Sequence, residues 1–131
     1  MTSTEFRTRR LTMGKTQRQV ADLLGVSLRA IHSFEQGWRK IPVHVERQTL
    51  LIVMLSRRAD KPETATCWKV RRCPPGIRNR CPAWEFKAGH LCWFINGTIC
   101  RGEAHLTWRD KMRICRSCKV FLDAVGPAVT E

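Results

Sequence analysis

Cysteine is the residue type whose number and spacing in this chain could do the most distinctive chemistry. Seven cysteines fall between residues 67 and 118, and only Cys115 and Cys118 form a close Cys-x2-Cys pair. Thiolates are soft ligands for zinc and for iron–sulfur clusters, and four of them complete either site. The ligands that we expect are Cys81, Cys100, Cys115 and Cys118, and the further candidates are Cys67, Cys73 and Cys92.

Three interpretations of these cysteines remain open. We favour a thiolate-bound iron–sulfur cluster or zinc ion. A small domain with few aliphatic side chains has a small hydrophobic core, and a bound metal supplies the additional stabilisation that its fold needs. Iron–sulfur comes before zinc, because the irregular spacing among tryptophans is unlike that of a zinc ribbon. A metal-free thiol switch comes second, and buried, inert cysteines come third. His90 and His105 lack a His-x3-His or Cys-x2-His partner, so we interpret both as structural.

The residues around the cysteines are basic or aromatic. Positive charge lowers the pKa of a thiol and offsets the negative charge of a thiolate-bound metal. The basic neighbours in sequence are Arg71, Arg72, Arg80, Arg101, Arg116 and Lys119. Tryptophans can exclude water from a metal site, but we interpret them mainly as the core of a small domain. These are Trp68, Trp84, Trp93 and Trp108.

The chain is strongly basic, with 24 Lys and Arg against 11 Asp and Glu and a formal net charge of +13. Such an excess favours a polyanionic partner, because Lys and Arg displace counterions from phosphates. The longest apolar run, residues 50 to 55, is too short to cross a bilayer, and no apolar signal region opens the chain. We therefore expect a soluble cytoplasmic protein that does not bind membranes, in which structural disulfides are rare.

Helix signals and composition divide the chain in two. We expect a helical domain at 1–60, a linker at 61–66 that contains Pro62, a Cys-rich domain at 67–122 and a tail at 123–131. Helices are expected near 4–13, at 17–24, at 28–36 and at 43–58. Thr16 and Ser27 cap the second and third of these, and Gly37 ends the third. The fold class is mainly α, followed by a small irregular domain with only short helical or strand pieces.

The segment 16–37 is typical of two short helices joined by a tight turn. Ala21 is small where the helices approach each other, and Gly25 can adopt a positive φ in the turn at little steric cost. Apolar residues at helical spacing predict one small core, formed by Val20, Leu24, Val26, Ile31 and Phe34. A helix-turn-helix of this kind places its second helix in the DNA major groove.

Residues 5–58 resemble the phage-repressor and Cro-like (Xre-like) family. The motifs that carry the resemblance are Thr-Gln at the first of the two helices, Ala-x3-Gly, Val-Ser before the second helix and Glu-x-Gly after it. The resemblance implies that Gln17 binds a phosphate and braces the second helix, and that Arg10 and Glu35 form an ion pair. It also implies base contacts from Leu28, Arg29 and Ser33 and backbone contacts from Arg39 and Lys40.

Side-chain chemistry agrees with these roles. Arg29 can bind guanine with two hydrogen bonds, and Leu28 can contact a thymine methyl. The amides at the start of the second helix favour a phosphate beside Ser27. The full set of expected DNA contacts is Gln17, Arg18, Ser27, Leu28, Arg29, His32, Ser33, Trp38, Arg39 and Lys40.

The chain departs from the family after the basic loop, where one long helix stands in place of two. We expect the apolar face of this helix to complete the core and to make some contact in a homodimer on double-stranded DNA. Its residues are Val45, Leu50, Leu51, Met54 and Leu55.

Residues 66–122 resemble the cysteine-rich two-CW module of bacterial signalling and regulatory proteins. The motifs are Cys-Trp-x4-Cys, Cys-Pro-Ala, Cys-Trp-Phe-Ile-Asn-Gly-Thr-Ile-Cys-Arg-Gly and Lys-x3-Cys-x2-Cys-x2-Phe. This resemblance implies a sensor or ligand-binding module and names no cofactor. The stretch between Cys73 and Cys81 is shorter than the usual pattern.

The sequence thus predicts a DNA-binding transcriptional regulator with a metal, iron–sulfur or redox-sensing module, and not an enzyme. It contains no Gly-rich phosphate loop, paired catalytic carboxylates or Ser/His/Asp arrangement, which argues against a kinase or hydrolase. Two alternatives remain. One is a thiol oxidoreductase that uses Cys115 and Cys118, although no βαβ pattern flanks the pair. The other is a zinc-folded adaptor for protein interactions.

Overall fold

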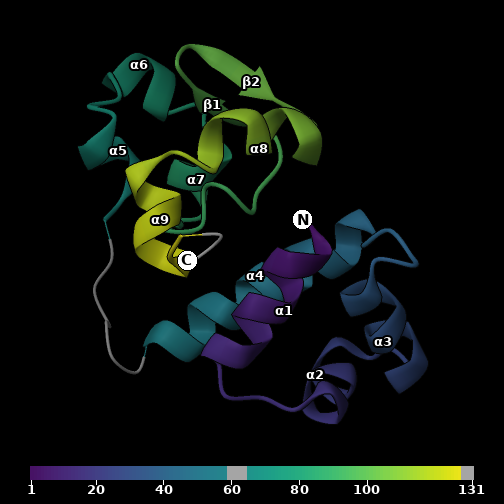
Figure 1. Ribbon diagram of the computed structural model, residues 1–131. Helices are drawn as coiled ribbons and strands as arrows, with labels where there is room; N and C mark the ends of the chain where they lie inside the picture. The colour runs from purple at the N-terminus through teal and green to yellow at the C-terminus, as the bar shows by residue number, and fades with distance from the viewer. Residues whose placement is uncertain (59–64, 128–131) are drawn as a thin grey trace. The chain divides into compact units, whose positions relative to one another are not determined.

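The computed structural model of the chain describes residues 1–58 and 65–127. It divides into two compact units, the first built mainly from Met1–Ser56 and the second from Arg57–Gly126 (Figure 1). Residues 61–64 of the expected linker and 128–131 of the expected tail lie outside the described residues. In the described parts of the chain, no helix is both long enough and apolar enough to cross a membrane.

The first unit is built from helices whose ends follow local capping signals. They are α1 (Ser3–Thr12), α2 (Gln17–Leu24), α3 (Leu28–Gln36) and α4 (Val43–Arg58). Thr16 Oγ1 accepts a hydrogen bond from the Gln19 amide at 3.1 Å, and the Gln19 side chain accepts one from the Thr16 amide at 2.9 Å. Ser27 Oγ caps α3 by accepting from the Ala30 amide at 3.0 Å. The predicted bounds of α2, α3 and α4 are confirmed, and α1 lies one residue before its predicted position.

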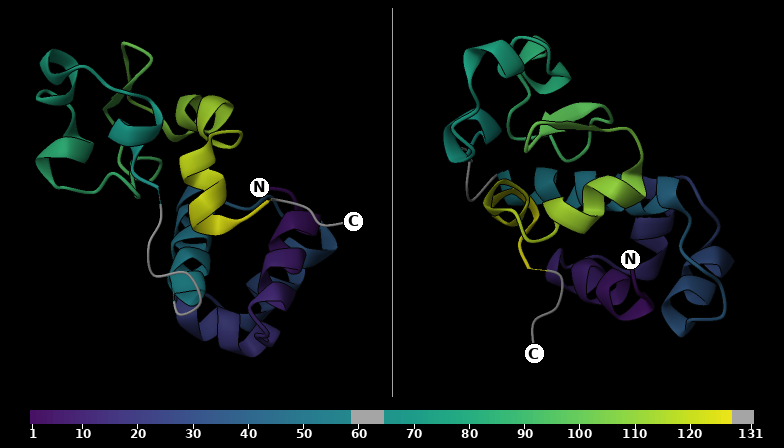
Figure 2. Two further views of the ribbon diagram at one scale, coloured as in Figure 1. Left: turned by 90° about the vertical axis from the view of Figure 1, so that its left-hand side faces the viewer. Right: turned by 90° about the horizontal axis from the view of Figure 1, so that it is seen from above.

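A tight turn at Gly25 sets α2 and α3 side by side (Figure 2). Gly25 has φ +68°, the left-handed conformation expected of it. The two helices and α1 enclose a core in which Phe6 meets Phe34 edge-on at 5.9 Å. The buried members of this core are Phe6, Val20, Ala21, Leu24, Ala30, Ile31, Phe34 and Val45, and Val26 packs against them. The core predicted from helical spacing is therefore confirmed.

The apolar face of α4 is only partly covered. Val45, Leu50 and Met54 are buried, Leu51 is half-buried and Leu55 is exposed. The expected contribution to a core is confirmed for Val45. The expected homodimer contact stays a prediction.

The second unit consists of short elements. It begins with α5 (Cys67–Val70), α6 (Pro75–Arg78) and α7 (Pro82–Glu85), each of four residues. An antiparallel hairpin of β1 (Thr98–Cys100) and β2 (Glu103–His105) follows, and its turn places Arg101 at φ 56° and Gly102 at φ 80°. The unit ends with α8 (Trp108–Cys115) and α9 (Lys119–Val125).

The end of α9 corrects one predicted boundary. The expected tail begins at residue 123, but α9 continues through Val125. Val120, Phe121, Ala124 and Val125 are all buried, and this spacing of one and four residues is that of an apolar helix face. This apolar helix face was not predicted from the sequence.

Tryptophans form the core of the second unit, as the sequence predicts. Trp93 is fully buried, and its ring meets Phe121 at 5.4 Å, Phe94 at 5.9 Å and Trp108 at 6.5 Å. Each contact is close to edge-to-face, the arrangement that aromatic rings prefer. Trp68 and Trp84 are half-buried and pack edge-on at 4.9 Å.

Candidate functional site

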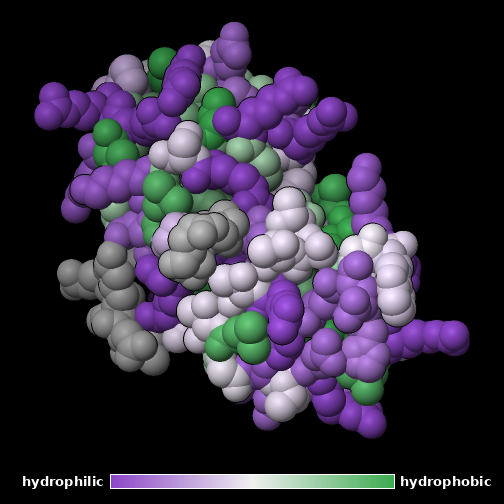
Figure 3. Space-filling view, viewed as in Figure 1, coloured by the Kyte–Doolittle hydropathy of each residue, from purple (hydrophilic) through white to green (hydrophobic). Residues whose placement is uncertain are grey.

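The residues expected to contact DNA lie on α2, on α3 and in the loop after α3, and none of them is buried. Arg18, Ser27, Arg29, His32, Trp38, Arg39 and Lys40 are exposed, and Gln17, Leu28 and Ser33 are half-buried. In the face seen in Figure 3, hydrophilic residues and residues of intermediate hydropathy predominate, and strongly apolar residues are scattered. The expected contact residues of the first unit are thus accessible while its core residues stay buried.

Glu35 joins three helices at one carboxylate. Arg10 of α1 donates from Nε to Glu35 Oε2 at 2.6 Å and from Nη2 to Oε1 at 2.9 Å. Gln17 of α2 donates from Nε2 to the same Oε1 at 3.3 Å. The expected ion pair and the expected brace from Gln17 to α3 are confirmed. Such bidentate, charge-assisted bonds fix the relative orientation of the helices that they join.

The loop after α3 folds back on the helix. The amides of Trp38 and Arg39 both donate to the Ser33 carbonyl, at 3.0 and 3.3 Å. The guanidinium of Arg39 lies 5.3 Å from the centre of the Phe34 ring. This cation–π contact restricts the position of the Arg39 side chain. Trp38 is 78% exposed, although indole rings are usually well covered. The loop thus offers two cations and one uncovered aromatic ring.

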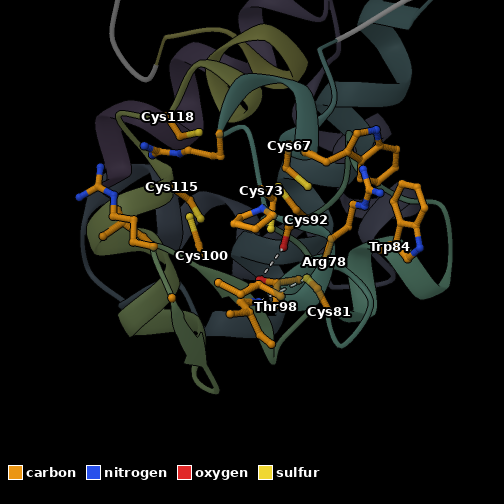
Figure 4. A pocket seen from close by; sticks show the side chains of 18 of the residues that line it. Cys67, Cys73, Arg78, Cys81, Trp84, Cys92, Thr98, Cys100, Cys115 and Cys118 are labelled. Carbon is orange, nitrogen blue, oxygen red and sulfur yellow. Dashed lines mark hydrogen bonds between the residues drawn. The ribbon is translucent and has the colours of Figure 1, made fainter.

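All seven cysteines line one cavity in the second unit. The cavity has a volume of about 130 Å³ and takes lining residues from α5, α6, α7, the hairpin and α8 (Figure 4). All seven side chains are free thiols. Cysteines spread over 52 positions of sequence, from 67 to 118, therefore meet at one place. Sequence spacing alone cannot predict such a convergence.

Three of the four expected metal ligands adjoin one another. The thiols of Cys100, Cys115 and Cys118 act on one another electrostatically, and the Arg71 side chain hydrogen-bonds with Cys118. Figure 4 shows the sulfurs of Cys100 and Cys115 facing each other. Cys81 lies elsewhere on the cavity wall, beside Thr98.

Cys81 has a hydrogen-bond partner of its own. Its Sγ accepts from the Ile99 amide at 3.3 Å. Among the described residues, no group of three or more His, Cys, Asp or Glu side chains has the arrangement needed to hold a metal ion. All seven candidate cysteine ligands thus line one cavity. The four that were expected to bind the metal, Cys81, Cys100, Cys115 and Cys118, are not gathered at a single point.

The cysteines of the two Cys-Trp dipeptides, Cys67 and Cys92, contact each other. The side chains of Cys67 and Cys92 hydrogen-bond with each other. This bond lowers the pKa of Cys67 to about 7, against burial, which acts to raise it. The same bond, together with burial, raises the pKa of Cys92. Cys92 therefore keeps its proton and donates it toward the Cys67 sulfur.

Burial governs the remaining thiols whose pKa is shifted. It raises the pKa of Cys115 to about 11 and also raises the pKa of Cys73 and Cys100. An attacking thiol in a Cys-x2-Cys oxidoreductase has a lowered pKa. The environment of Cys115 is the opposite of that, so it gives no support to an oxidoreductase at this pair.

Lys111 is a site residue that the sequence analysis missed. Its side chain is 1% exposed, lines the cysteine cavity and donates from Nζ to Thr98 Oγ1. Burial lowers the pKa of Lys111, and the thiols of Cys115 and Cys92 act to raise it. A signal was available, because Lys111 precedes Cys115 by one helical turn in the motif Lys-x3-Cys-x2-Cys.

His105 has a structural contact of the kind expected. Its Nε2 lies 3.1 Å from the carbonyl oxygen of Cys100, across the hairpin. This contact stabilises the β1–β2 pair beside the cavity.

The chain was compared with protein-family models, with curated proteins and with solved structures, and none of them matches it.

Proposed function

We propose that this chain is a sequence-specific DNA-binding transcriptional regulator. In this proposal the first unit is a helix-turn-helix domain of the phage-repressor and Cro-like kind. The second unit senses redox state, a gas or metal availability through its cysteine cavity. The observation that carries the proposal is the Glu35 junction, because it fixes α2 and α3 against α1 while α3 keeps Arg29 and His32 exposed.

The exposed face of α3 has the chemistry needed to bind bases. Arg29 is exposed and carries a planar guanidinium, which suits guanine O6 and N7. His32 lies three residues later, on the same side of the helix. Leu28 is half-buried at the start of α3, where a thymine methyl could cover it.

The residues around α3 have the chemistry needed to bind phosphates. Arg39 and Lys40 are exposed in the loop that follows the helix, and Arg18 is exposed on α2. Each phosphate contact adds affinity that does not depend on base sequence and that falls with salt. We propose double-stranded DNA as the partner and a homodimer as the bound form.

The cysteine cavity suits a group with thiolate ligands and a net negative charge. Lys111 is a buried ammonium, and a buried charge is costly unless an opposite charge compensates it. Arg71 adds a second cation beside Cys118. Four thiolates around a metal group carry a net negative charge, so these two cations support such a group.

We propose an iron–sulfur cluster as the first choice and zinc as the second. The thiols lie around the wall of a cavity, which is how protein ligands surround a cluster, whereas zinc draws four sulfurs to within about 2.3 Å of one point. Cys100, Cys115 and Cys118 would supply three ligands, and Cys81 stays the proposed fourth. A cluster would supply a reversible response to oxidants. Trp84 and Ile77 supply apolar wall to the cavity, and Lys111 lines it together with the thiols.

The proposal is tested by selection of bound sequences from random duplex DNA. Full-length protein is purified without oxygen, and its iron, sulfide and zinc contents are measured on the same sample. We expect one enriched sequence motif and a bound metal in fixed proportion to protein. Enrichment of no sequence would remove the DNA-binding assignment, and a metal-free sample that binds DNA would leave a thiol switch as the sensing chemistry.

A further inference from the structure

We propose that Cys67 and Cys92 are a peroxide-oxidisable thiol pair, which closes to a disulfide between the two Cys-Trp dipeptides. The inference goes beyond the proposed function and does not depend on DNA binding. It divides the seven cysteines by role, because Cys100, Cys115 and Cys118 gather around Arg71 while Cys67 and Cys92 pair with each other. The ligand class is a small hydroperoxide, which includes hydrogen peroxide.

The backbone holds the two dipeptides together. The Cys67 amide donates to the Gly89 carbonyl at 3.0 Å, three residues before Cys92. Gly89 is buried beneath the Trp68 ring, and a Cβ at this position would lie 2.6 Å from Trp68 Cζ3. The absence of a side chain at Gly89 therefore lets the segment 89–92 approach α5.

The thiols complete this contact. Cys67 and Cys92 hydrogen-bond with each other at the wall of the cavity. Cys67 is half-buried and begins α5, whereas Trp93, the next residue after Cys92, is fully buried in the aromatic core. Both thiols are half-buried, but Cys67 is the less deeply buried of the two, and Cys92 directly precedes a core residue.

The chemistry proceeds in two balanced steps. The Cys67 thiolate attacks the terminal oxygen of the hydroperoxide, the O–O bond breaks, and the other oxygen leaves as an alcohol or water after it takes a proton. This step oxidises Cys67 to a sulfenic acid. The Cys92 sulfur then attacks the Cys67 sulfur, the S–O bond breaks, and hydroxide leaves as water with the Cys92 proton. Two thiols lose two electrons in total, and the peroxide gains them.

The cavity supplies conditions for the first step. The Cys92 thiol hydrogen-bonds to the Cys67 sulfur, and Lys111 places a positive charge near both. Arg71 and Arg78 line the same cavity. A thiolate next to a resolving thiol is the usual arrangement in redox-sensing cysteines.

The test is disulfide mapping on the full-length protein. Reduced protein, purified without oxygen, is treated with one equivalent of hydrogen peroxide, blocked with an alkylating reagent, digested with trypsin and analysed by tandem mass spectrometry. We expect a mass loss of about 2 Da and a link between the peptide ending at Lys69 and the peptide 88–101. Because the second peptide holds both Cys92 and Cys100, fragmentation between them assigns the partner. A link of Cys67 to any other cysteine, or a Cys67 that stays reduced, overturns the proposal.

Variants separate the two roles. In Cys92→Ser we expect Cys67 to stop at the sulfenic acid and to react with dimedone. In Cys67→Ser we expect no sulfenic acid at Cys92. Cys73→Ser removes another half-buried thiol of the same cavity and is the matched control, which should form the disulfide at the unchanged rate. A sulfenic acid at Cys92 in the Cys67 variant would contradict the assigned order.

Substitutions at two separate glycines test the close approach of Gly89 to Trp68. Gly89→Ala must displace Trp68, so we expect the disulfide to form at least about tenfold more slowly. Gly76→Ala is the control, because nothing lies within 4 Å of a Cβ there and the rate should not change. Equal rates in the two variants would show that this close approach does not position the pair.

Discussion

The guanidinium of Arg10 and the carboxylate of Glu35 form two hydrogen bonds, at 2.6 and 2.9 Å, between α1 and α3. The side chains are 11% and 4% exposed, so water screens the pair little. Gln17 of α2 joins the same carboxylate. The orientation of α3, and with it the proposed DNA contact, therefore depends on one acidic side chain.

Glu35→Gln should destabilise the first unit by about 2–3 kcal/mol, because it leaves the Arg10 charge without its partner in a largely buried place. Urea denaturation measures the change. Arg113→Gln is the control, since Arg113 and Asp110 form an exposed pair at 3.9 Å, and we expect a change within about 0.5 kcal/mol. Equal effects of the two variants would argue against a structural role of the Glu35 junction.

Arg29→Ala and Lys40→Ala should weaken DNA binding in different ways. Loss of Arg29 should relax the preference at one base pair, at a cost of about 1–3 kcal/mol on the selected duplex. Loss of Lys40 should weaken binding to all duplexes alike. It should also reduce the magnitude of the slope of log binding constant against log salt concentration by about 1. Arg7→Ala removes an exposed charge of α1 outside the expected interface and should do neither. Titrations against selected and scrambled duplexes distinguish these results, and unchanged binding by both variants would exclude this interface.

Lys111→Met should have opposite effects with and without a thiolate-bound group. Without the group, removal of a buried ammonium should raise the free energy of unfolding by about 1–2 kcal/mol. With the group, loss of the compensating charge should speed its removal by a chelator. Lys119→Met changes an exposed lysine directly after Cys118 and should do neither. If Lys111→Met and Lys119→Met release metal at the same rate, the charge of Lys111 has no part in the site.

The alkylation rate of Cys67 should depend on pH around neutrality. Its lowered pKa of about 7 means that the thiolate forms as pH rises through 7, earlier than in an ordinary thiol. Cys115, with a pKa near 11, should stay slow up to about pH 9. Iodoacetamide labelling of reduced, chelator-treated protein, read by mass spectrometry, gives both profiles.

Cys92→Ala tests the cause of this shift. It removes the hydrogen bond to Cys67, so the midpoint for Cys67 should move up toward about 8.5. Cys73→Ala should leave the midpoint in place. A midpoint that does not move in Cys92→Ala would assign the shift to another group.

The helices of the first unit could be predicted from sequence because their ends are local. Thr16 and Ser27 cap helices through amides three residues away, and Gly25 and Gly37 end them with a positive φ. The Arg10–Glu35 pair was predicted from the resemblance to the Cro-like family, not from spacing. The helices of this unit were therefore predicted with their observed bounds, except that α1 lies one residue before its predicted position.

The cysteine cavity could be predicted only in part, because its contacts are non-local. The short helices and strands of the second unit and its tryptophan core were predicted from the sequence. The pairing of Cys67 with Cys92 and the separate place of Cys81 depend on how loops converge, which spacing does not encode. Lys111 was missed because its partner Thr98 is 13 residues away, on a strand that the sequence did not place.

The measurement that tests the central claim most directly is an anisotropy titration of a selected duplex and a scrambled duplex. The full-length protein is used without oxygen, and the same sample is used again after treatment with peroxide. The account predicts tighter binding to the selected duplex and a change of about tenfold or more in that affinity after oxidation. Equal affinities for the two duplexes in both samples would contradict the claim that this chain is a DNA-binding regulator controlled by its cysteines.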